Sequence, residues 1–199
     1  MNNPFNPGYW EEADLVTFGF AQVGKHVRVA KNCTIIGLQN ISLGDNVRID
    51  GGTVLAASSG YIRIGSYVHI GGMSFLAGAG GIEMRDFSGL SQGVRIYSAS
   101  DDYSGQSLTN PTVPREFLNV KMAPVSLGRH VIVGSGSVIL PGCNIGEGSS
   151  VGALSLVNKS LDEWGVYFGT PCKRMKARSK NLLEAEERLL SVIEPAVHQ

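Results

Sequence analysis

Aliphatic residues recur at every sixth position through most of the chain. A period of six matches neither the 3.6-residue repeat of an amphipathic helix nor the strict alternation of one long strand. It is typical of a coil with three short flat sides, each of which points one aliphatic side chain into a central core. The repeat therefore predicts a β-solenoid. Its aliphatic positions are Val23, Val29, Ile35, Leu43, Ile49, Leu55, Ile64, Ile70, Leu76, Met84, Leu90 and Ile96, then Leu127, Val133, Ile139, Ile145, Val151 and Val157.

Small residues mark the corners of this coil. Many of the aliphatic residues are followed by one of the chain's 26 glycines. Tight corners need a positive φ or a close backbone approach, which glycine accepts without steric cost and Asn and Asp accept next best. Four residues after the aliphatic position comes a second inward place, which is usually small or β-branched. Coils start at residues 23, 43, 64 and 84, so we expect residues about twenty apart to lie over one another.

Three segments fall outside the repeat. Residues 1–20 carry prolines and aromatic residues, and we expect them to cap the open end of the solenoid. Residues 98–124 leave the coil as a polar, turn-rich insertion; loops of this length are usually functional or disordered, and we expect a function. Residues 179–194 predict an amphipathic helix that Pro195 ends. The predicted organisation is a cap over 1–20, a β-helix domain over 21–178, and a helix and tail over 179–199.

Composition narrows the range of functions. Lys plus Arg equals Asp plus Glu, at 17 each, which argues against nucleic acid or an anionic membrane as partner. Cys33, Cys143 and Cys172 lack a metal-site spacing and are expected to be free thiols in a reducing compartment. We find neither a signal-peptide pattern nor an apolar run long enough for a membrane span. These features predict a cytoplasmic protein.

The hexads, the insertion and the tail at residues 167–174, Tyr-Phe-Gly-Thr-Pro-Cys-Lys-Arg, together resemble the hexapeptide-repeat acyltransferases over about residues 20–178. The resemblance implies a mainly β fold, the left-handed parallel β-helix. Periodicity alone does not give this hand, which departs from the usual right-handed crossover. The stretch from Ile96 to Gly105 resembles a branch with acetyltransferases of sugar and surface-polysaccharide biosynthesis.

This resemblance also implies an activity and an assembly. The expected reaction moves an acetyl group from acetyl-CoA to a hydroxyl or amine of a sugar or nucleotide-sugar, in lipopolysaccharide or capsule biosynthesis. Family members are typically homotrimers, with three active sites in the clefts between subunits. The acceptor itself, the choice between O- and N-transfer, and the length of the acyl group stay open at this point.

Binding of CoA would explain why the tail carries cations next to a proline. The cofactor carries a pyrophosphate and a 3′-phosphate, which suit cations beside a turn fixed by proline. Small residues in the late coils leave room for the pantetheine arm. The candidate cofactor contacts are Gly134, Ser135, Gly152, Ala153, Thr170, Lys173 and Arg174. The alternative for the two cations is a solvated surface tail.

Acyl transfer needs a base for the acceptor's proton and hydrogen-bond donors for the oxyanion. Histidine is the usual base near neutral pH. The chain has four histidines, of which His198 lies in the tail. His26 and His130 fall at corners, where we expect solvent or a contact with another subunit. His69 directly precedes an inward isoleucine and should therefore point outward from a flat side.

Because residues about twenty apart should lie over one another, His69 is expected in a column with polar neighbours. One and two coils below it are Arg48 and Arg28, and one coil above is Gly89. A polar column beside a bare glycine predicts the border of a substrate cleft, and a solvated column without a role is the alternative. Two tyrosines near the start of the insertion add further candidates. The candidate substrate contacts are therefore Arg28, Arg48, Gly89, Tyr97 and Tyr103.

The chain departs from its apparent relatives at one place. Many sugar and antibiotic acetyltransferases carry a catalytic histidine after a Thr-Ala-Thr-like run, but residues 98–102 read Ser-Ala-Ser-Asp-Asp. Two arrangements remain open. In the first, His69 is the base and Asp101 or Asp102 orients it or binds the acceptor. In the second, an aspartate itself receives the proton.

Two other functions on the same fold are alternatives. A γ-type carbonic anhydrase needs a metal held by three histidines across a subunit boundary, and only His69 lies on a plausible outward face. We therefore predict no metal site. A non-enzymatic scaffold or ice-binding solenoid usually shows regular ladders on a flat face. The third outward column is irregular and partly apolar, which favours burial against another subunit; it reads Thr34, Val54, Phe75, Arg95, Val138 and Leu156.

Overall fold

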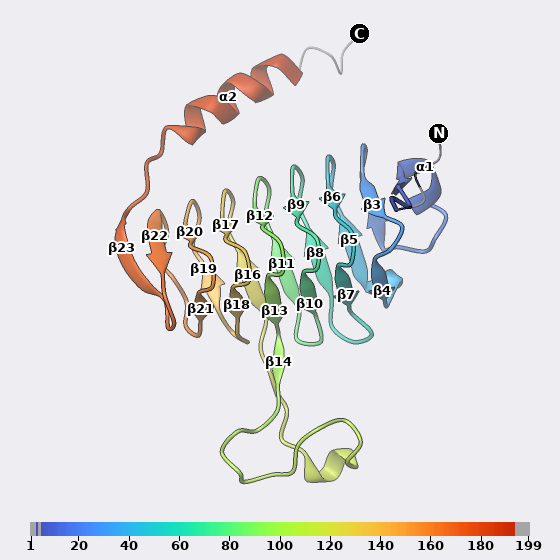
Figure 1. Ribbon diagram of the computed structural model, residues 1–199, viewed down its shortest axis with the longest axis vertical. Helices are drawn as coiled ribbons and strands as arrows, with labels where there is room; N and C mark the ends of the chain where they lie inside the picture. The colour runs from blue at the N-terminus through green and yellow to red at the C-terminus, as the bar shows by residue number, and fades with distance from the viewer. Residues whose placement is uncertain (1–2, 4, 194–199) are drawn as a thin grey trace.

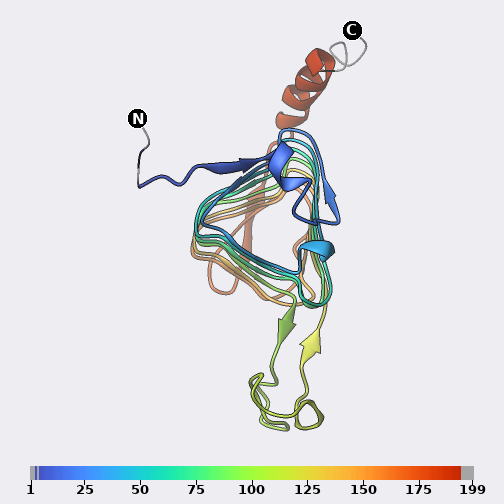
Figure 2. The ribbon, with the colours of Figure 1, turned by 90° about the vertical axis from the view of Figure 1, so that its right-hand side faces the viewer.

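The computed structural model describes residues 3 and 5–193 and shows a triangular solenoid of stacked coils (Figure 1). Three mainly parallel sheets form its sides, one with nine strands and two with six. Seen from the N-terminal end, the chain turns anticlockwise as it recedes from the viewer, so the solenoid is left-handed (Figure 2). The predicted mainly β, left-handed β-helix is confirmed.

We call the nine-stranded sheet A and the two six-stranded sheets B and C. Sheet A contains β1 (Tyr9–Glu11), β3 (Arg28–Ala30), β6 (Arg48–Ile49), β9 (His69–Ile70), β12 (Gly89–Leu90), β17 (Ile132–Val133), β20 (Ser150–Val151), β22 (Gly165–Phe168) and β23 (Lys173–Ala177). Sheet B contains β2 (Gln22–Val23), β5 (Ile41–Leu43), β8 (Ile62–Ile64), β11 (Ile82–Met84), β16 (Val125–Leu127) and β19 (Asn144–Ile145). Sheet C contains β4 (Thr34–Ile36), β7 (Val54–Ala56), β10 (Phe75–Ala77), β13 (Arg95–Tyr97), β18 (Val138–Ile139) and β21 (Leu156–Val157).

The strand register confirms the stacking that the hexads predict. Ile49 pairs with Ile70, Ile70 with Leu90, and Leu90 with Val133 along sheet A. All four side chains are buried in one continuous core. Each such aliphatic side chain contributes about 1.5–3 kcal/mol when it is fully removed from water. The six-residue side thus fixes both the core and the alignment of the outward residues.

Several small polar residues at the second inward position have partners, although the buried Ser88 hydroxyl has none among the described residues. The buried Ser74 hydroxyl donates to the carbonyl oxygen of Gly71 at 2.7 Å, and the buried Ser137 hydroxyl donates to that of Gly152 at 3.0 Å. A buried hydroxyl without a partner is costly, so these bonds explain why serine is tolerated inside the coil.

The corner between sheets B and A differs from the sequence prediction. Three successive coils place an aromatic residue in the left-handed region here, namely Tyr67, Phe87 and His130, with φ of 58°, 57° and 59°. This conformation is strained for a bulky residue. The rings offset that cost by stacking: Tyr67 and Phe87 have centroids 4.8 Å apart, and Phe87 and His130 5.3 Å apart. We call these three residues the aromatic corner.

The N-terminal segment covers the first coil. Strand β1 pairs antiparallel with β3, and the short helix α1 (Glu12–Leu15) follows it. Leu15 is buried in the core of the solenoid. A 3₁₀ turn, η1 (Leu38–Asn40), lies between β4 and β5.

The insertion and the C-terminal helix lie at different vertices of the triangle. The insertion carries the antiparallel pair β14 (Ala99–Ser100) and β15 (Lys121–Met122) and the 3₁₀ turn η2 (Arg115–Phe117). It extends from the vertex between sheets C and B, which faces sheet A across the triangle. Helix α2 (Leu182–Ile193) runs beside the vertex between sheets B and A (Figures 1 and 2). The predicted helix is confirmed; Pro195 and the tail lie outside the described residues.

Candidate active site

The predicted polar column is present on sheet A. Arg28 pairs with Arg48, Arg48 with His69, and His69 with Gly89. The side chains of Arg48 and His69 are both about half exposed, at 49%. The column therefore offers an accessible imidazole between a cation and a glycine.

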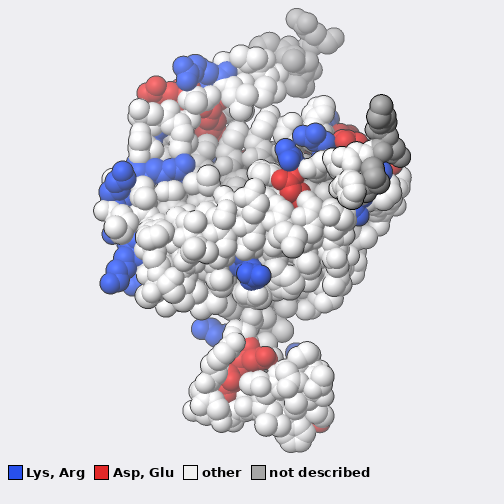
Figure 3. Space-filling model, in the orientation of Figure 1, with Lys and Arg blue, Asp and Glu red and all other residues white. Residues whose placement is uncertain are grey.

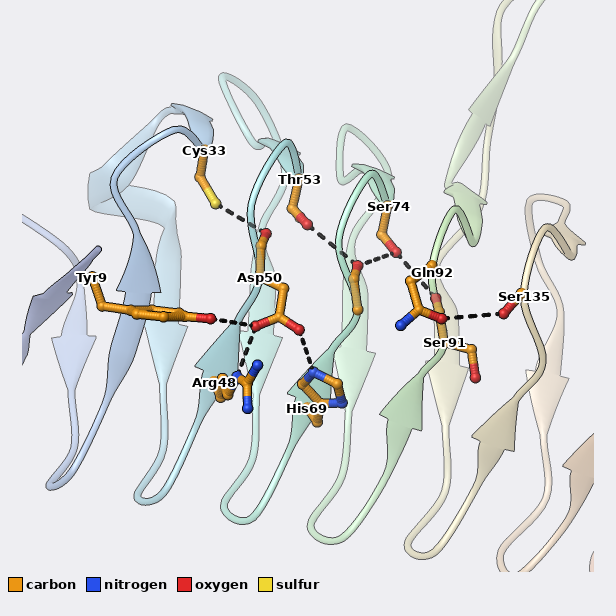
Figure 4. Close-up of polar contacts among 11 residues, drawn as sticks. Tyr9, Cys33, Arg48, Asp50, Thr53, His69, Ser74, Ser91, Gln92 and Ser135 are labelled. Atoms are coloured by element: carbon orange, nitrogen blue, oxygen red, sulfur yellow. Dashed lines mark hydrogen bonds and ion pairs between the residues drawn. The ribbon is translucent and has the colours of Figure 1, made fainter. Parts of the chain in front are cut away.

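Asp50, one residue beyond β6, contacts two of these side chains, Arg48 and His69, and also Tyr9 (Figure 4). Its Oδ1 accepts hydrogen bonds from the Tyr9 hydroxyl at 2.8 Å and from Arg48 Nε at 2.7 Å. Its Oδ2 lies 2.8 Å from His69 Nε2. The partners come from β1, from the same coil and from the next coil, so only the stacked fold brings them together.

The electrostatics of this cluster keep Asp50 ionised. Burial is the largest single influence on its pKa and acts to raise it, but the hydrogen bonds from His69, Tyr9 and Arg48 together outweigh burial and lower the pKa. An ionised Asp50 accepts the Nε2 proton of His69, which assigns the tautomer with Nδ1 as the acceptor. Asp50 thus orients the imidazole and leaves one nitrogen available to take a proton.

Beside His69 the face of sheet A is bare. A Cβ built at Gly89 would meet a single neighbour, the His69 carbonyl oxygen at 3.5 Å. A cavity of about 530 Å³ opens here between sheet A and α2, and Gly89, His69, Ser91 and Gln92 line one part of it. Figure 3 shows the surface hollowed below α2 on this face. The volume falls in the range of small-molecule sites.

Helix α2 is held over this cavity by a buried charge. Glu186 accepts a hydrogen bond from His130 Nε2 at 2.9 Å and pairs with the Arg129 guanidinium. Arg178, just before the helix, donates from Nη1 to the carbonyl oxygens of His130 at 2.8 Å and Gly148 at 3.0 Å. The expectation of solvent or a partner subunit around His130 is therefore wrong: its side chain is buried under α2 of its own chain.

Within one chain the structure does not bring Asp101 or Asp102 to His69. Both aspartates lie on the insertion, which leaves the solenoid at the vertex opposite sheet A (Figure 2). Hydrogen bonds from Ser104, through side chain and backbone, and from Ser107 lower the pKa of Asp102 to about 2. This carboxylate is occupied in shaping its own loop.

The two candidate tyrosines lie away from the column as well. Tyr97 ends β13 on sheet C, where its half-buried ring packs against Phe75 at a centroid distance of 5.8 Å. Tyr103 lies on the insertion and is almost fully exposed. Neither side chain touches the His69 column within one chain.

The candidate cofactor residues gather around the last coils. The tail forms the antiparallel pair of β22 and β23, with Lys173 and Arg174 exposed on its second strand. The Thr170 hydroxyl donates to the Leu154 carbonyl oxygen at 3.2 Å, which ties the tail to the corner that follows Gly152 and Ala153. Ser135 donates to Gln92 Oε1 at 3.4 Å, one coil closer to the His69 column (Figure 4).

Two of these glycines also have a packing role. A Cβ at Gly134 would overlap the backbone nitrogen of Ala153 and lie 2.8 Å from its Cα. A Cβ at Gly152 would overlap the ring of Phe168. Successive coils approach closely here, so a larger residue at either position would force its neighbours to shift.

Comparison with known proteins identifies the family. Residues 124–159 match the family model described as bacterial transferase hexapeptide (six repeats). The chain is 40% identical over 188 residues to the Escherichia coli dTDP-4-amino-4,6-dideoxy-D-glucose acyltransferase, covering 94% of this chain and 96% of that one. The chain belongs to the hexapeptide-repeat acyltransferases.

Solved structures of AntD, an N-acyltransferase from Bacillus cereus, agree with this acyltransferase in fold and sequence. The complex of AntD with dTDP and 3-hydroxybutyryl-CoA has a TM-score of 0.90 and 42% identity, and covers 94% of this chain and 98% of that one. An AntD variant with one serine replaced, in complex with dTDP-4-amino-4,6-dideoxyglucose and coenzyme A, has a TM-score of 0.89 and 41% identity, with coverage of 93% and 98%. The predicted family and enzyme class are thus confirmed.

Sequence reasoning about the acyltransferase missed Asp50, Tyr9 and the α2 contacts. Asp50 follows an inward residue by one position, a place where a side chain can reach along sheet A, and that spacing was the available signal. Tyr9 lies 41 residues before Asp50 and had no such signal.

The family assignment decides against the carbonic anhydrase and scaffold alternatives. No helix among residues 3 and 5–193 is long and apolar enough to cross a membrane.

Proposed function

We propose that this acyltransferase moves an acyl group from acyl-CoA to the amino group of a dTDP-linked aminodideoxy sugar. The observation that carries the proposal is an oriented His69–Asp50 pair beside a bare glycine. It occurs in a chain 42% identical over nearly its whole length to an N-acyltransferase that binds dTDP and an acyl-CoA. We therefore propose that the nucleotide-sugar acceptor is an aminosugar and that the transfer is to nitrogen.

The site supports the following reaction. The neutral amine nitrogen attacks the thioester carbonyl carbon, and a tetrahedral oxyanion forms. When it collapses, the carbon–sulfur bond breaks and CoA leaves as a thiolate. His69 Nδ1 takes the proton that the nitrogen loses and passes it to the thiolate, so charge and protons balance. Asp50 stays ionised and stabilises the imidazolium formed in between.

The second arrangement of the sequence prediction remains a candidate. An aspartate of the insertion would receive the proton instead, and AntD variants with one aspartate replaced have been crystallised with dTDP and coenzyme A. The insertion points away from its own sheet A, so Asp101 would serve a neighbouring copy. This fits the proposed homotrimer with sites between subunits. The half-buried apolar side chains of Val54, Phe75 and Leu156 on sheet C support such a contact.

We propose acetyl-CoA as the donor, bound along the last coils. Lys173 and Arg174 would contact its phosphates, and the corner formed by Gly134, Ser135, Gly152 and Ala153 would hold the pantetheine arm. The exposed position of both cations beside the anchored Thr170 supports this placement. AntD binds 3-hydroxybutyryl-CoA, so a longer acyl group is the direct competitor.

The test is a free-thiol assay of CoA release with dTDP-4-amino-4,6-dideoxyglucose. We expect turnover with this acceptor, none with dTDP-glucose, which lacks the amine, and a product with a new amide by mass spectrometry. Parallel reactions with acetyl-CoA and 3-hydroxybutyryl-CoA decide the acyl group. Equal rates with and without the amine would refute N-acylation.

Two variants decide the base. If His69 is the base, His69→Ala lowers kcat at least about a hundredfold while Asp101→Asn has a smaller effect. The reverse order assigns the proton to the aspartate. A loss under about tenfold in His69→Ala at unchanged stability removes His69 as the base.

A role in surface-polysaccharide assembly also remains a proposal. Deleting the gene should remove the N-acyl sugar from the surface glycan, and complementation should restore it. A glycan of unchanged composition would contradict this role.

A further inference from the structure

The cavity between sheet A and α2 has two unlike parts. One part carries His69, Ser91 and Gln92 beside Gly89. The other is walled by the aromatic corner and by Leu182, Ala185 and Leu189 of α2. The second part is not used by the chemistry described above. Its aromatic and aliphatic walls suit a planar or apolar group rather than a bare phosphate.

Helix α2 has a fixed position on the solenoid and forms one wall of the cavity. None of its residues is fully buried, so little hydrophobic packing fixes its position. Its hold on the solenoid comes from Glu186, whose side chain is 10% exposed between His130 and Arg129. A buried carboxylate is costly unless it is paired, so the favoured position of the helix is the one in which Glu186 is paired. That position also brings Ala185 and Leu189 over the cavity.

The charges around the cavity favour an anionic ligand. Arg178 lines it, and its side chain is fixed by hydrogen bonds from Nη1 to corner carbonyls. Among the described residues that line it, Glu186 is the single carboxylate, and it is already paired with two basic side chains. A diphosphate entering here would meet a cation without facing an unpaired carboxylate.

The dimensions favour an elongated ligand. From Phe87 to Gln92 the chain crosses the face of sheet A, a span of at most about 17 Å at the strand rise per residue. A nucleotide-sugar is elongated, with a planar base at one end and the sugar at the other. Its base matches the aromatic corner, and its aminosugar then lies beside His69.

We propose that the part of the cavity between the aromatic corner and α2 binds the nucleobase and ribose of the acceptor, and that Glu186 is the positioning residue that holds α2 in place as its wall. This inference rests on the proposed function, since it assigns one end of the same substrate. It makes α2 a determinant of acceptor affinity and leaves acyl-CoA binding to the late coils.

The direct test fills the cavity. Ala185→Trp adds an indole to the face of α2 that lines the cavity, whereas Glu187→Trp adds the same group to an exposed site that does not. Titration calorimetry with dTDP should show at least about tenfold weaker binding for Ala185→Trp and less than about twofold change for the control. Binding of CoA should be equal in both. Wild-type dTDP affinity in Ala185→Trp, or no dTDP binding by the wild type, would overturn the inference.

A second test removes the ion pair that holds α2 in position. Glu186→Gln removes the charge that pairs with His130, and Glu187→Gln removes a charge that does not line the cavity. We expect Glu186→Gln to raise the acceptor KM about fivefold or more at unchanged acyl-CoA KM, with the helical circular dichroism retained. A KM equal to that of Glu187→Gln would contradict the positioning role. Tight dTDP binding without turnover of any aminosugar would refute the proposed function while supporting the nucleotide site.

Discussion

Replacing Asp50 by asparagine tests the proposed active site most sharply, because one carboxylate holds three side chains. The change keeps the size of the side chain and removes its charge. It weakens the hydrogen bonds from the Tyr9 hydroxyl at 2.8 Å, from Arg48 Nε at 2.7 Å and from His69 Nε2 at 2.8 Å.

The expected loss of stability follows from these partners. Arg48 and His69 are about half exposed, so solvent screens each of these ion pairs to about 0–1 kcal/mol. The Tyr9 hydrogen bond adds about 0.5–1.5 kcal/mol. We therefore expect Asp50→Asn to lower the free energy of unfolding by about 1–2 kcal/mol at pH 7.

The loss should depend on pH in a definite direction. The pKa of Asp50 in the folded protein is lowered, so its carboxylate stabilises the fold above the ordinary carboxyl pKa, and this contribution is lost as the pH falls through the lowered value. The difference between wild type and Asp50→Asn should thus be full at pH 7 and shrink as the pH drops below about 4.

Urea unfolding at pH 7 and pH 3 measures this difference, and the aminosugar assay measures the rate. We expect kcat to fall at least about tenfold in Asp50→Asn, because a neutral amide stabilises the imidazolium less and can also donate to Nε2, so the tautomer is no longer fixed. Asp50→Glu, which keeps the charge, serves as the control. An equal stability difference at both pH values, or an unchanged kcat, would refute the reasoning.

Three further predictions concern the fold and the donor site. Ile70→Ala removes a fully buried side chain from the core and should cost about 2–5 kcal/mol in urea unfolding; a cost below 1 kcal/mol would contradict the close stacking of coils. Gly134→Ala should lower Tm and soluble yield even without CoA, because its Cβ overlaps the next coil; a stable variant with only weaker CoA binding would assign Gly134 to the cofactor alone. Lys173→Ala with Arg174→Ala should weaken CoA binding and flatten its salt dependence in calorimetry, whereas Lys159→Ala should change neither.

Much of the fold could be predicted from the sequence because the repeat is short and local. A six-residue side admits one inward aliphatic residue, so the coils can stack in one way, and Arg28, Arg48, His69 and Gly89 align as a consequence. The corners were less predictable. Gly, Asn or Asp was expected there, but stacking of Tyr67 on Phe87 compensates for the strain of a positive φ, and neither ring by itself indicates this.

The sequence alone determined the solenoid, its inward and outward positions, and which flat side carries His69, because each of these depends on spacings of six or about twenty residues. The tertiary structure decided which carboxylate His69 meets and what covers the cavity beside it. Tyr9 reaches Asp50 across 41 residues, and Glu186 reaches His130 across 56. Such contacts depend on where a terminal segment folds back onto the coil, which is a matter of packing and charge pairing in space and leaves no period in the chain.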